Sequence, residues 1–215
     1  PVNARLRYEA SSYLSYHANL NEVESQLNRA LQLPQGFNPR AIGLATTWRA
    51  NKTNDADVVR AALSYFNQEA FQYTLEPPLL GANNVDDFLF TYKQGFCEHY
   101  ASAFVFLMRA AHIPARVVTG YQGGEFNDVG NYYIVRQSDA HAWAEVWLAG
   151  QGWVRVDPTA AIAPERVQRG LSAALPNNAT LPFMARNPPQ WMRDLRLNWD
   201  AMANQWNQWV IGYNS

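Results

Sequence analysis

The sequence predicts an α+β fold, in which a block of helices precedes a meander of antiparallel strands. Apolar residues recur at helical spacing up to about residue 111, and strand-like segments follow between residues 115 and 157. A Gly-containing turn at residues 149–152 joins the last two segments as a hairpin. The chain has 215 residues, of which 48% are hydrophobic, so we expect one domain with its own core.

Composition and charge exclude several classes of protein. Lys and Arg number 17 and Asp and Glu 18, and this balance argues against a nucleic-acid-binding protein. The lone cysteine, Cys97, excludes an internal disulfide and any multi-cysteine zinc site. No segment matches a metal-binding pattern, so neither a metal nor another cofactor is predicted. No apolar run approaches the roughly 18 residues of a membrane span, and the start at Pro1 indicates a piece of a longer protein.

The first half of the chain is predicted to be mainly helical. We expect a strand at residues 5–16, then helices at 22–31, 41–50 and from residue 55, where Asn54 or Asp55 caps the helix. An extended piece at 71–75 ends at two prolines. Asp86 and Asp87 supply negative charge to the first turn of the next helix. The best-marked helix runs from 96 to 111, with its apolar residues on one face.

The second half is predicted to be a sheet followed by a tail. We expect a buried strand at 115–121, a loop at 123–130, and strands at 131–136, 141–148 and 153–157. Residues 1–190 are interpreted as one domain with a core at about 55–166, and 191–215 as a C-terminal helix. That helix is predicted to dock on the domain through an apolar seam, or alternatively to lie at a membrane interface; the seam is formed by Met192, Leu195, Trp199, Met202, Trp206 and Trp209.

Cys97 is the first candidate for chemistry because it begins the best-marked helix. Unpaired backbone N–H groups and the positive end of the helix dipole both favour the thiolate, which is the reactive form of cysteine. A buried, inert cysteine is the alternative interpretation. A nucleophilic cysteine also needs a base, and that base needs an orienting acceptor.

His141 and Asp157 are the predicted base and orienter. In a hairpin closed at 149–152, positions near 141–144 lie opposite those near 157–160, so the carboxylate stands beside the imidazole. His99 is two residues from Cys97 and points about 200° away from it on the helix, so it is not expected to serve as the base. His112 falls at the far end of the same helix.

Several neighbours complete the predicted site. Trp143 and Trp147 share a strand face with His141 and either wall the cleft or pack in the core. Glu145 on that face is expected to pair with an arginine. The backbone N–H of Cys97 is the expected first oxyanion donor, with the second drawn from Tyr73, Gln94 or a tryptophan. We therefore name Tyr73, Gln94 and Trp143 as substrate-binding candidates.

Four segments together resemble the core of the transglutaminase-like superfamily: GFCEHYASA at 95–103, RAAHIPARVVTGY at 109–121, DAHAWAEVW at 139–147 and GWVRVDPT at 152–159. The segments FQYTLEPP at 71–78 and VDDFLF at 85–90 extend the likeness to periplasmic domains of bacterial membrane-embedded members, of the kind described from Pseudomonas. The resemblance implies a papain-like fold, with Cys97 as nucleophile, His141 as base and acid, and Asp157 as orienter.

The resemblance also implies an activity and a setting. It implies a protein-glutamine gamma-glutamyltransferase, which passes the acyl group of a glutamine side chain through a Cys97 thioester to a primary amine. Flanking transmembrane helices and a periplasmic location follow from it, with envelope proteins or peptidoglycan peptides as partners. Two alternatives stay open: a cysteine peptidase or amidase using the same three residues, and a non-catalytic envelope scaffold.

Overall fold

The computed structural model describes residues 8–13, 15–165 and 190–213 of the chain. The backbone divides into two compact units. The larger unit comprises residues 17–123 and 135–180, and it contains every residue that the sequence places at the candidate site. The smaller unit comprises residues 1–16, 124–134 and 181–215.

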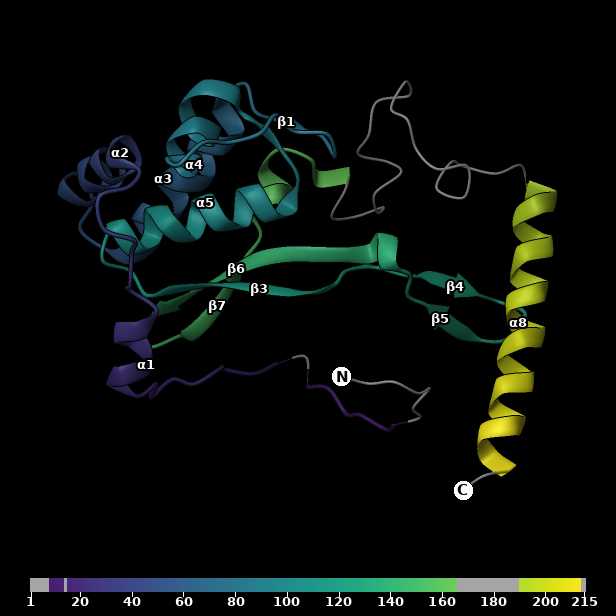
Figure 1. Cartoon of the computed structure of the whole chain (residues 1–215). Helices are drawn as coiled ribbons and strands as arrows, with labels where there is room; N and C mark the ends of the chain where they lie inside the picture. The colour runs from purple at the N-terminus through teal and green to yellow at the C-terminus, as the bar shows by residue number, and fades with distance from the viewer. Residues whose placement is uncertain (1–7, 14, 166–189, 214–215) are drawn as a thin grey trace. The chain divides into compact units, whose positions relative to one another are not determined.

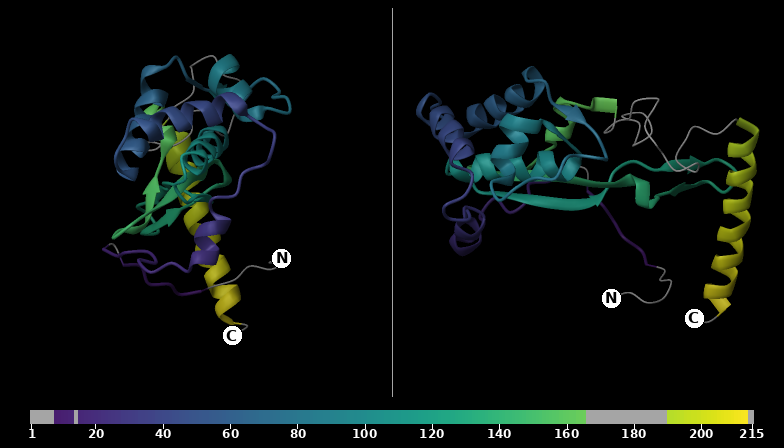
Figure 2. Two further views of the ribbon diagram at one scale, coloured as in Figure 1. Left: turned by 90° about the vertical axis from the view of Figure 1, so that its left-hand side faces the viewer. Right: turned by 45° about the horizontal axis from the view of Figure 1, so that its top comes forward.

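A three-stranded antiparallel sheet and one long helix form the centre of the larger unit. The strands are β3 (Ala115–Tyr121), β6 (Ala140–Leu148) and β7 (Gly152–Val156), in the order β3-β6-β7. Helix α5 (Cys97–Ala110) lies along β6 and β3 on one face of this sheet (Figures 1 and 2). Alternate residues of β6 that face α5, such as Ala144 and Val146, are fully buried because the helix covers them.

Further helical segments of this unit pack against α5 on its side away from the sheet. They are α2 (Pro39–Ala50), α3 (Asp55–Gln68), the short α4 (Asn84–Asp86) and the π-helical turn η1 (Asp87–Tyr92), as Figure 1 shows. A further helix, α1 (Glu24–Arg29), precedes them. This order of helices before strands confirms the predicted α+β class.

Two helix starts show how side chains set the boundaries. The side chain of Asn54 accepts a hydrogen bond from the backbone N–H of Asp57, so Asn54 caps α3 as predicted. Asp86 follows another rule: its carboxylate is buried and accepts from the backbone N–H groups of Arg40 and Ala41. Asp86 therefore satisfies the first turn of α2, an element 45 residues away that the sequence pattern does not link to it.

An aromatic cluster anchors the first turns of α5. Tyr100 is fully buried, and its ring centroid lies 5.0 Å from that of Phe88 and 6.0 Å from that of Phe71. Its hydroxyl donates to the carbonyl of Gln72. Gln72 belongs to β1 (Gln72–Tyr73), which pairs in parallel with β2 (Gln94–Gly95) just ahead of α5. The start of α5 is thus held from both its buried face and its preceding strand.

Two sequence predictions for this part of the fold are wrong. Residues 8–13 and 15–16 form no strand, and the rest of the predicted 5–16 strand lies outside the described residues. The strand at 115–121 exists, but only Ala115 is buried. Among the described strands β3 pairs with β6 alone, so it is an edge strand with side chains such as Val117 open to solvent.

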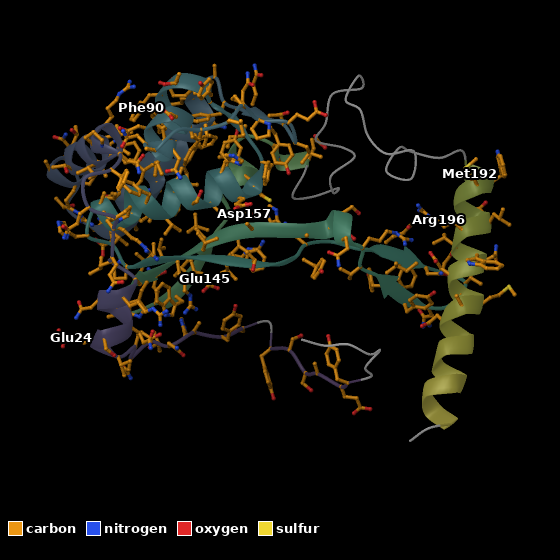
Figure 3. The ribbon with its side chains drawn as sticks, in the orientation of Figure 1. Glu24, Phe90, Glu145, Asp157, Met192 and Arg196 are labelled. Carbon is orange, nitrogen blue, oxygen red and sulfur yellow. The ribbon has the colours of Figure 1, made fainter. Side chains whose placement is uncertain are left out.

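The smaller unit consists of a hairpin and a long helix. Strands β4 (Glu125–Asn127) and β5 (Tyr132–Ile134) pair within the segment predicted to be a loop and a strand. Helix α8 (Gln190–Tyr213) contacts this hairpin, since Arg196, labelled in Figure 3, forms an ion pair with Glu125 at 2.8 Å. No helix in the described ranges is long and apolar enough to cross a membrane.

The face that α8 uses differs from the predicted seam. Leu195, Trp199 and Met202 are 64–70% exposed, whereas Leu197 and Ala201 are buried. The carbonyl of Leu197 also accepts a hydrogen bond from Asn127, so polar contacts of the hairpin select this face. The side chains of Trp206 and Trp209 lie outside the described residues.

Candidate active site

Cys97 is the first residue of α5 and lies in a small buried cluster. The residue before it, Phe96, has an extended backbone, so the chain turns into the helix at the cysteine itself. Cys97 is 9% exposed and packs with Ala101 of its own helix and Ala142 of β6. The thiol therefore faces the start of β6, where His141 is the neighbouring residue.

His141 and Asp157 are hydrogen-bonded, as counting residues around the hairpin turn predicts. The Nε2 atom of His141 lies 2.8 Å from Oδ2 of Asp157. β6 and β7 pair Ala144 with Val156, so continuing the register places Asp157 next to the His141 end of the ladder. Asp157 also caps the following 3-10 turn, η3 (Pro158–Ala161), by accepting from the backbone N–H of Thr159. The carboxylate is thus fixed on both of its oxygens.

The pKa of His141 lies above its ordinary value of 6.5, through opposing causes. Burial alone lowers the pKa, because it disfavours the charged ring, but hydrogen bonds and charges of Asp157 and Cys97 outweigh that effect. The other ring nitrogen, Nδ1, is buried and has no nitrogen or oxygen partner in the described structure. The side chain of Cys97 is near enough to this ring to contribute to its raised pKa.

Arg155 and Trp143 flank this pair, and the sequence analysis missed the arginine. The Trp143 ring stacks on that of His141, with centroids 6.2 Å apart and planes 25° from parallel. The guanidinium of Arg155 lies over the Trp143 ring, 4.4 Å from the ring centroid. It also reaches Oδ2 of Asp157 at 3.4 Å and Oε1 of Gln122 at 2.5 Å. The signal was present in the sequence, since residues two apart on a strand share a face.

Gly120 provides the room for the Trp143 ring. It lies opposite His141 in the β3–β6 register. A Cβ at this position would come within 2.9 Å of the ring of Trp143, so any larger residue would displace it. The glycine on the edge strand therefore helps to determine where the ring beside His141 lies.

The other predicted neighbours are distributed as follows. Gln94 is half-buried in β2, three residues before the cysteine, and Tyr73 is buried in the main core opposite Gly95. Trp147 lies away from the candidate site, and its indole N–H donates to the carbonyl of Asn19. Glu145 forms the predicted ion pair, with Arg116 at 2.7 Å.

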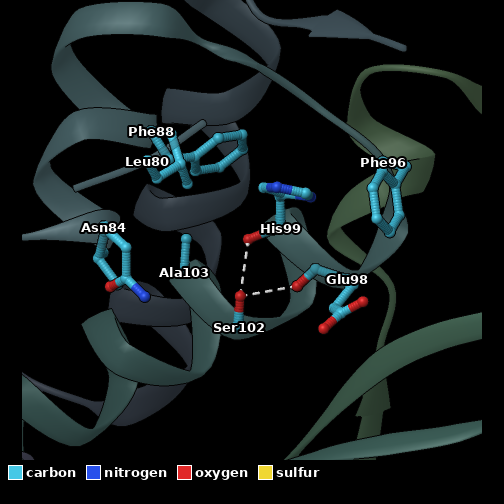
Figure 4. A pocket seen from close by; sticks show the side chains of 9 residues that line it. Leu80, Asn84, Phe88, Phe96, Glu98, His99, Ser102 and Ala103 are labelled. Carbon is cyan, nitrogen blue, oxygen red and sulfur yellow. Dashed lines mark hydrogen bonds between the residues drawn. The ribbon is translucent and has the colours of Figure 1, made fainter. Parts of the chain in front are cut away.

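The remaining histidines do not join this cluster. His99 lines a separate cavity formed partly by Phe88 and Phe96 (Figure 4). His112 follows α5 with a left-handed backbone, φ 59°, and ends the helix. His17 is exposed, and its Nδ1 lies 3.4 Å from the carbonyl of Gln151. Of the four histidines, only His141 therefore combines a carboxylate partner with the cysteine.

The family model described as the transglutaminase-like superfamily matches residues 42–158. The chain belongs to this superfamily. The match covers α5 and the whole three-stranded sheet, and it ends directly after Asp157.

Individual relatives narrow the likeness. The chain is 47% identical over 220 aligned residues to a protein-glutamine gamma-glutamyltransferase of Pseudomonas aeruginosa, covering 99% of this chain and 33% of that protein. It is 40% identical to an uncharacterized protein, YebA, of Bacillus subtilis over 61% of this chain and 19% of YebA. The chain thus spans about a third or less of the length of these relatives.

Solved structures agree with these matches. The crystal structure of the periplasmic domain of TgpA from Pseudomonas aeruginosa is 53% identical, with a TM-score of 0.71 over 73% of this chain and 54% of that one. The same domain bound to ethylmercury gives a TM-score of 0.69 over 70% of this chain and 54% of that one. The superfamily fold predicted from the sequence is confirmed.

Proposed function

We propose that this chain is the catalytic domain of a protein-glutamine gamma-glutamyltransferase, with Cys97, His141 and Asp157 as its catalytic residues. The observation that carries the proposal is one imidazole that lies 2.8 Å from a carboxylate, with the cysteine at the start of α5 near enough to raise its pKa. A base held between an acceptor and a nucleophile is the arrangement that covalent acyl transfer requires.

In the first step the Cys97 thiolate attacks the side-chain amide carbon of a glutamine. The new C–S bond forms, the C–N bond breaks, and ammonia leaves with a proton supplied by the His141 imidazolium. The raised pKa of His141 favours the imidazolium that this step consumes. Asp157 accepts from Nε2, and this directs the other ring nitrogen toward the sulfur.

In the second step a primary amine attacks the thioester. His141, now neutral, takes a proton from the amine, and the Cys97 thiolate leaves as the new amide forms. If water takes the place of the amine, the same residues deamidate the glutamine. Acyl transfer and hydrolysis therefore differ only in whether an amine or water attacks the thioester. An assay must identify which of the two accepts the acyl group.

The amide oxygen becomes an oxyanion in both steps and needs donors. We assign the backbone N–H of Cys97 as the first donor, because it begins α5 where the helix dipole is positive. Gln94, three residues earlier and half-buried, is the second donor we favour, since Tyr73 lies within the core. We assign Trp143 to the substrate-binding surface, because its ring stacks on that of His141.

The setting follows from the relatives. The solved neighbours are periplasmic domains, and we place this chain in the periplasm as part of a longer protein with flanking membrane segments. Its substrates are then glutamine-bearing proteins or peptides and primary amines of the cell envelope, peptidoglycan peptides among them.

The test is an incorporation assay. A glutamine-containing peptide and a fluorescent primary amine should give a labelled peptide with the wild-type chain. Cys97→Ala should remove labelling completely, because no other described group can form the thioester. Ser64→Ala is the matched control, since Ser64 is an exposed residue of α3 outside the candidate site.

Other outcomes would contradict the proposal. Deamidated or cleaved peptide without labelled product would identify a hydrolase that uses the same three residues. Labelling that survives in Cys97→Ala would remove the thioester from the account. No turnover of any amide, together with an unchanged cellular role of Cys97→Ala, would leave a non-catalytic scaffold.

A further inference from the structure

One edge of the three-stranded sheet is open beside the candidate active site. Strand β3 pairs with β6 on one side, and no strand of the described ranges pairs with it on the other. The start of this outer edge is covered, because the backbone N–H of Ala115 donates to the carbonyl of Ala30. The remainder, residues 117–121, is called the open edge below.

The direction of the backbone groups on the open edge follows from the β3–β6 register. In an antiparallel pair, directly opposite residues exchange hydrogen bonds at every second position. The N–H of Trp147 donates to the carbonyl of Pro114 just before β3. The N–H of Gln122 donates to the carbonyl of Asp139 just after it. Both bonds join opposite positions of the same register, so the even-numbered residues of β3 bond to β6. The odd-numbered residues therefore direct their N–H and C=O groups away from β6.

Three residues of the open edge thus present backbone groups to solvent: Val117, Thr119 and Tyr121. Within the part of the chain that the structure describes, nothing bonds to their outward N–H and C=O groups. Their side chains are exposed as well. Soluble proteins usually protect such an edge with lysine, proline or a bulge. This strand contains neither lysine nor proline, and it pairs with β6 without a break.

The open edge lies next to the candidate catalytic residues. Gly120 is opposite His141 in the β3–β6 register. Thr119 is opposite Ala142, which packs against Cys97. Neighbouring strands are about 4.8 Å apart, so a chain added to the open edge would lie about 10 Å from β6. About three residues of extended chain span that distance.

We propose that the open edge binds the glutamine-bearing substrate as an extended polypeptide that adds a strand to the sheet. A row of backbone donors and acceptors at strand spacing is matched by another extended backbone. The exposed Val117 and Thr119 side chains favour β-branched partners on the added strand. A glutamine about three residues beyond the paired segment then reaches Cys97. The assignment of the bound chain as acyl donor rests on the proposed function, whereas strand addition itself does not.

The first test measures binding to the Cys97→Ala chain, so that no acyl transfer takes place. The probe is an acetylated peptide of about ten residues, with alternating valine and threonine at its start and glutamine near its end. At a peptide concentration near ten times Kd, hydrogen exchange of the Val117, Thr119 and Tyr121 amides should slow about tenfold in NMR spectra. Exchange at Val118 should stay unchanged, because its N–H already bonds to β6.

Two changes separate backbone pairing from side-chain contact. N-methylation of every second peptide residue should abolish binding in one phase and preserve it in the other, because only alternate N–H groups of the peptide face β3. Thr119→Pro removes an outward N–H without removing a β3–β6 hydrogen bond, and it should weaken binding about tenfold. Thr119→Val is the matched control, because it keeps the N–H and should keep the affinity.

Several outcomes would overturn strand addition. These are the absence of saturable binding, equal slowing at odd-numbered and even-numbered amides, and equal binding of the two N-methylated peptides. Protection that appears without peptide and rises with protein concentration would assign the open edge to a second copy of the chain. The N-methylated peptides decide the question even where Thr119→Pro does not fold.

A second measurement identifies the bound chain as the acyl donor. With the wild-type chain and a fluorescent amine, the N-methylation phase that abolishes binding should lower kcat/KM for amine incorporation about tenfold, whereas the other phase should not. Equal incorporation into both peptides would show that the open edge binds a chain other than the acyl donor. Because the binding arm lacks Cys97, its failure is distinguishable from a failure of the proposed acyl transfer.

Discussion

Each of the two faces of the first turns of α5 has a histidine beside it, and these histidines differ in their charged partners and in the direction of their pKa shifts. On the Cys97 face, His141 has a carboxylate partner, and its pKa is raised. On the opposite face, burial outweighs the charge of Glu98 and lowers the pKa of His99. His99 is two residues from the cysteine in sequence, whereas His141 is 44 residues away (141 − 97).

The comparison shows that the environment of a histidine, and not its sequence distance from the nucleophile, decides its role. Both rings are largely enclosed by protein, so burial disfavours the charged form of each. Only His141 has an anionic group fixed beside it that reverses this effect. His141 is therefore suited to carry a proton, while His99 is suited to take part in neutral hydrogen bonding.

Removing the carboxylate of Asp157 should have the largest effect on activity. It makes the environment of His141 more like that of His99. Asp157→Asn replaces the charge with an amide of the same shape, so the pKa of His141 should fall and kcat should drop about 10²–10⁴-fold. Steady-state kinetics and a pH–rate profile measure both changes. Asp87→Asn is the control, because that carboxylate also accepts a backbone N–H, from Gly81, but belongs to η1. Equal losses in both variants would mean a general effect on folding.

The Arg155 stack should have a smaller effect on the same face. Arg155→Met removes the cation above Trp143 and the contact with Asp157, so Trp143 and the imidazole become less well positioned. We expect kcat to fall about two- to fivefold with a shifted pH–rate profile, and Arg155→Lys to restore part of the loss. Arg116→Met is a matched control, because Arg116 lies 4.1 Å from the ring of Trp153 elsewhere on the sheet. An unchanged pH profile in Arg155→Met would reduce the arginine to a structural role.

The smallest effect concerns stability against pH, where the two histidines should act in opposite directions. The folded-state pKa of His141 is raised, so its stabilisation is complete below the ordinary value of 6.5 and is lost as pH rises through the folded value. The folded-state pKa of His99 is lowered, so the fold loses stability as pH falls below 6.5.

Urea unfolding between about pH 5 and 8 measures this difference. His141→Gln should lose stability mainly at the acidic end, and His99→Gln should flatten the acidic decline. Ring-proton titrations by NMR of the wild-type chain give the two pKa values directly. Midpoints in the reverse order would contradict the comparison between the two faces.

Local patterns in the sequence predicted the candidate site around Cys97 better than the rest of the molecule. The hairpin register follows from counting residues around one turn, and the start of α5 follows from helix periodicity, so His141, Asp157 and Cys97 could be placed. To predict the position of Arg155, two observations had to be combined: it shares a strand face with Asp157, and its guanidinium packs on the Trp143 ring. The His99 cavity depends on the packing of residues 80–88 against α5, which no local pattern encodes.

The sequence pattern also did not predict which residues of β3 and α8 are exposed. An apolar run such as 115–121 indicates a strand, but its burial depends on whether a second strand pairs with it, and in the part of the chain that the structure describes β3 has one neighbour, β6. In α8 the spacing of the large apolar residues predicted one face, while hydrogen bonds and an ion pair to the β4–β5 hairpin select another. Tertiary contacts decide both outcomes.

The most direct test of the account is the mass of the acyl-enzyme. Intact-protein mass spectrometry after rapid mixing with a glutamine peptide, without amine, should find a covalent adduct equal to the peptide less one ammonia. Fragmentation should place the adduct on Cys97, hydroxylamine should release it, and Cys97→Ala should not form it. An adduct on another residue, or product formation without any adduct when the mixture is quenched during turnover, would contradict a thioester at the start of α5.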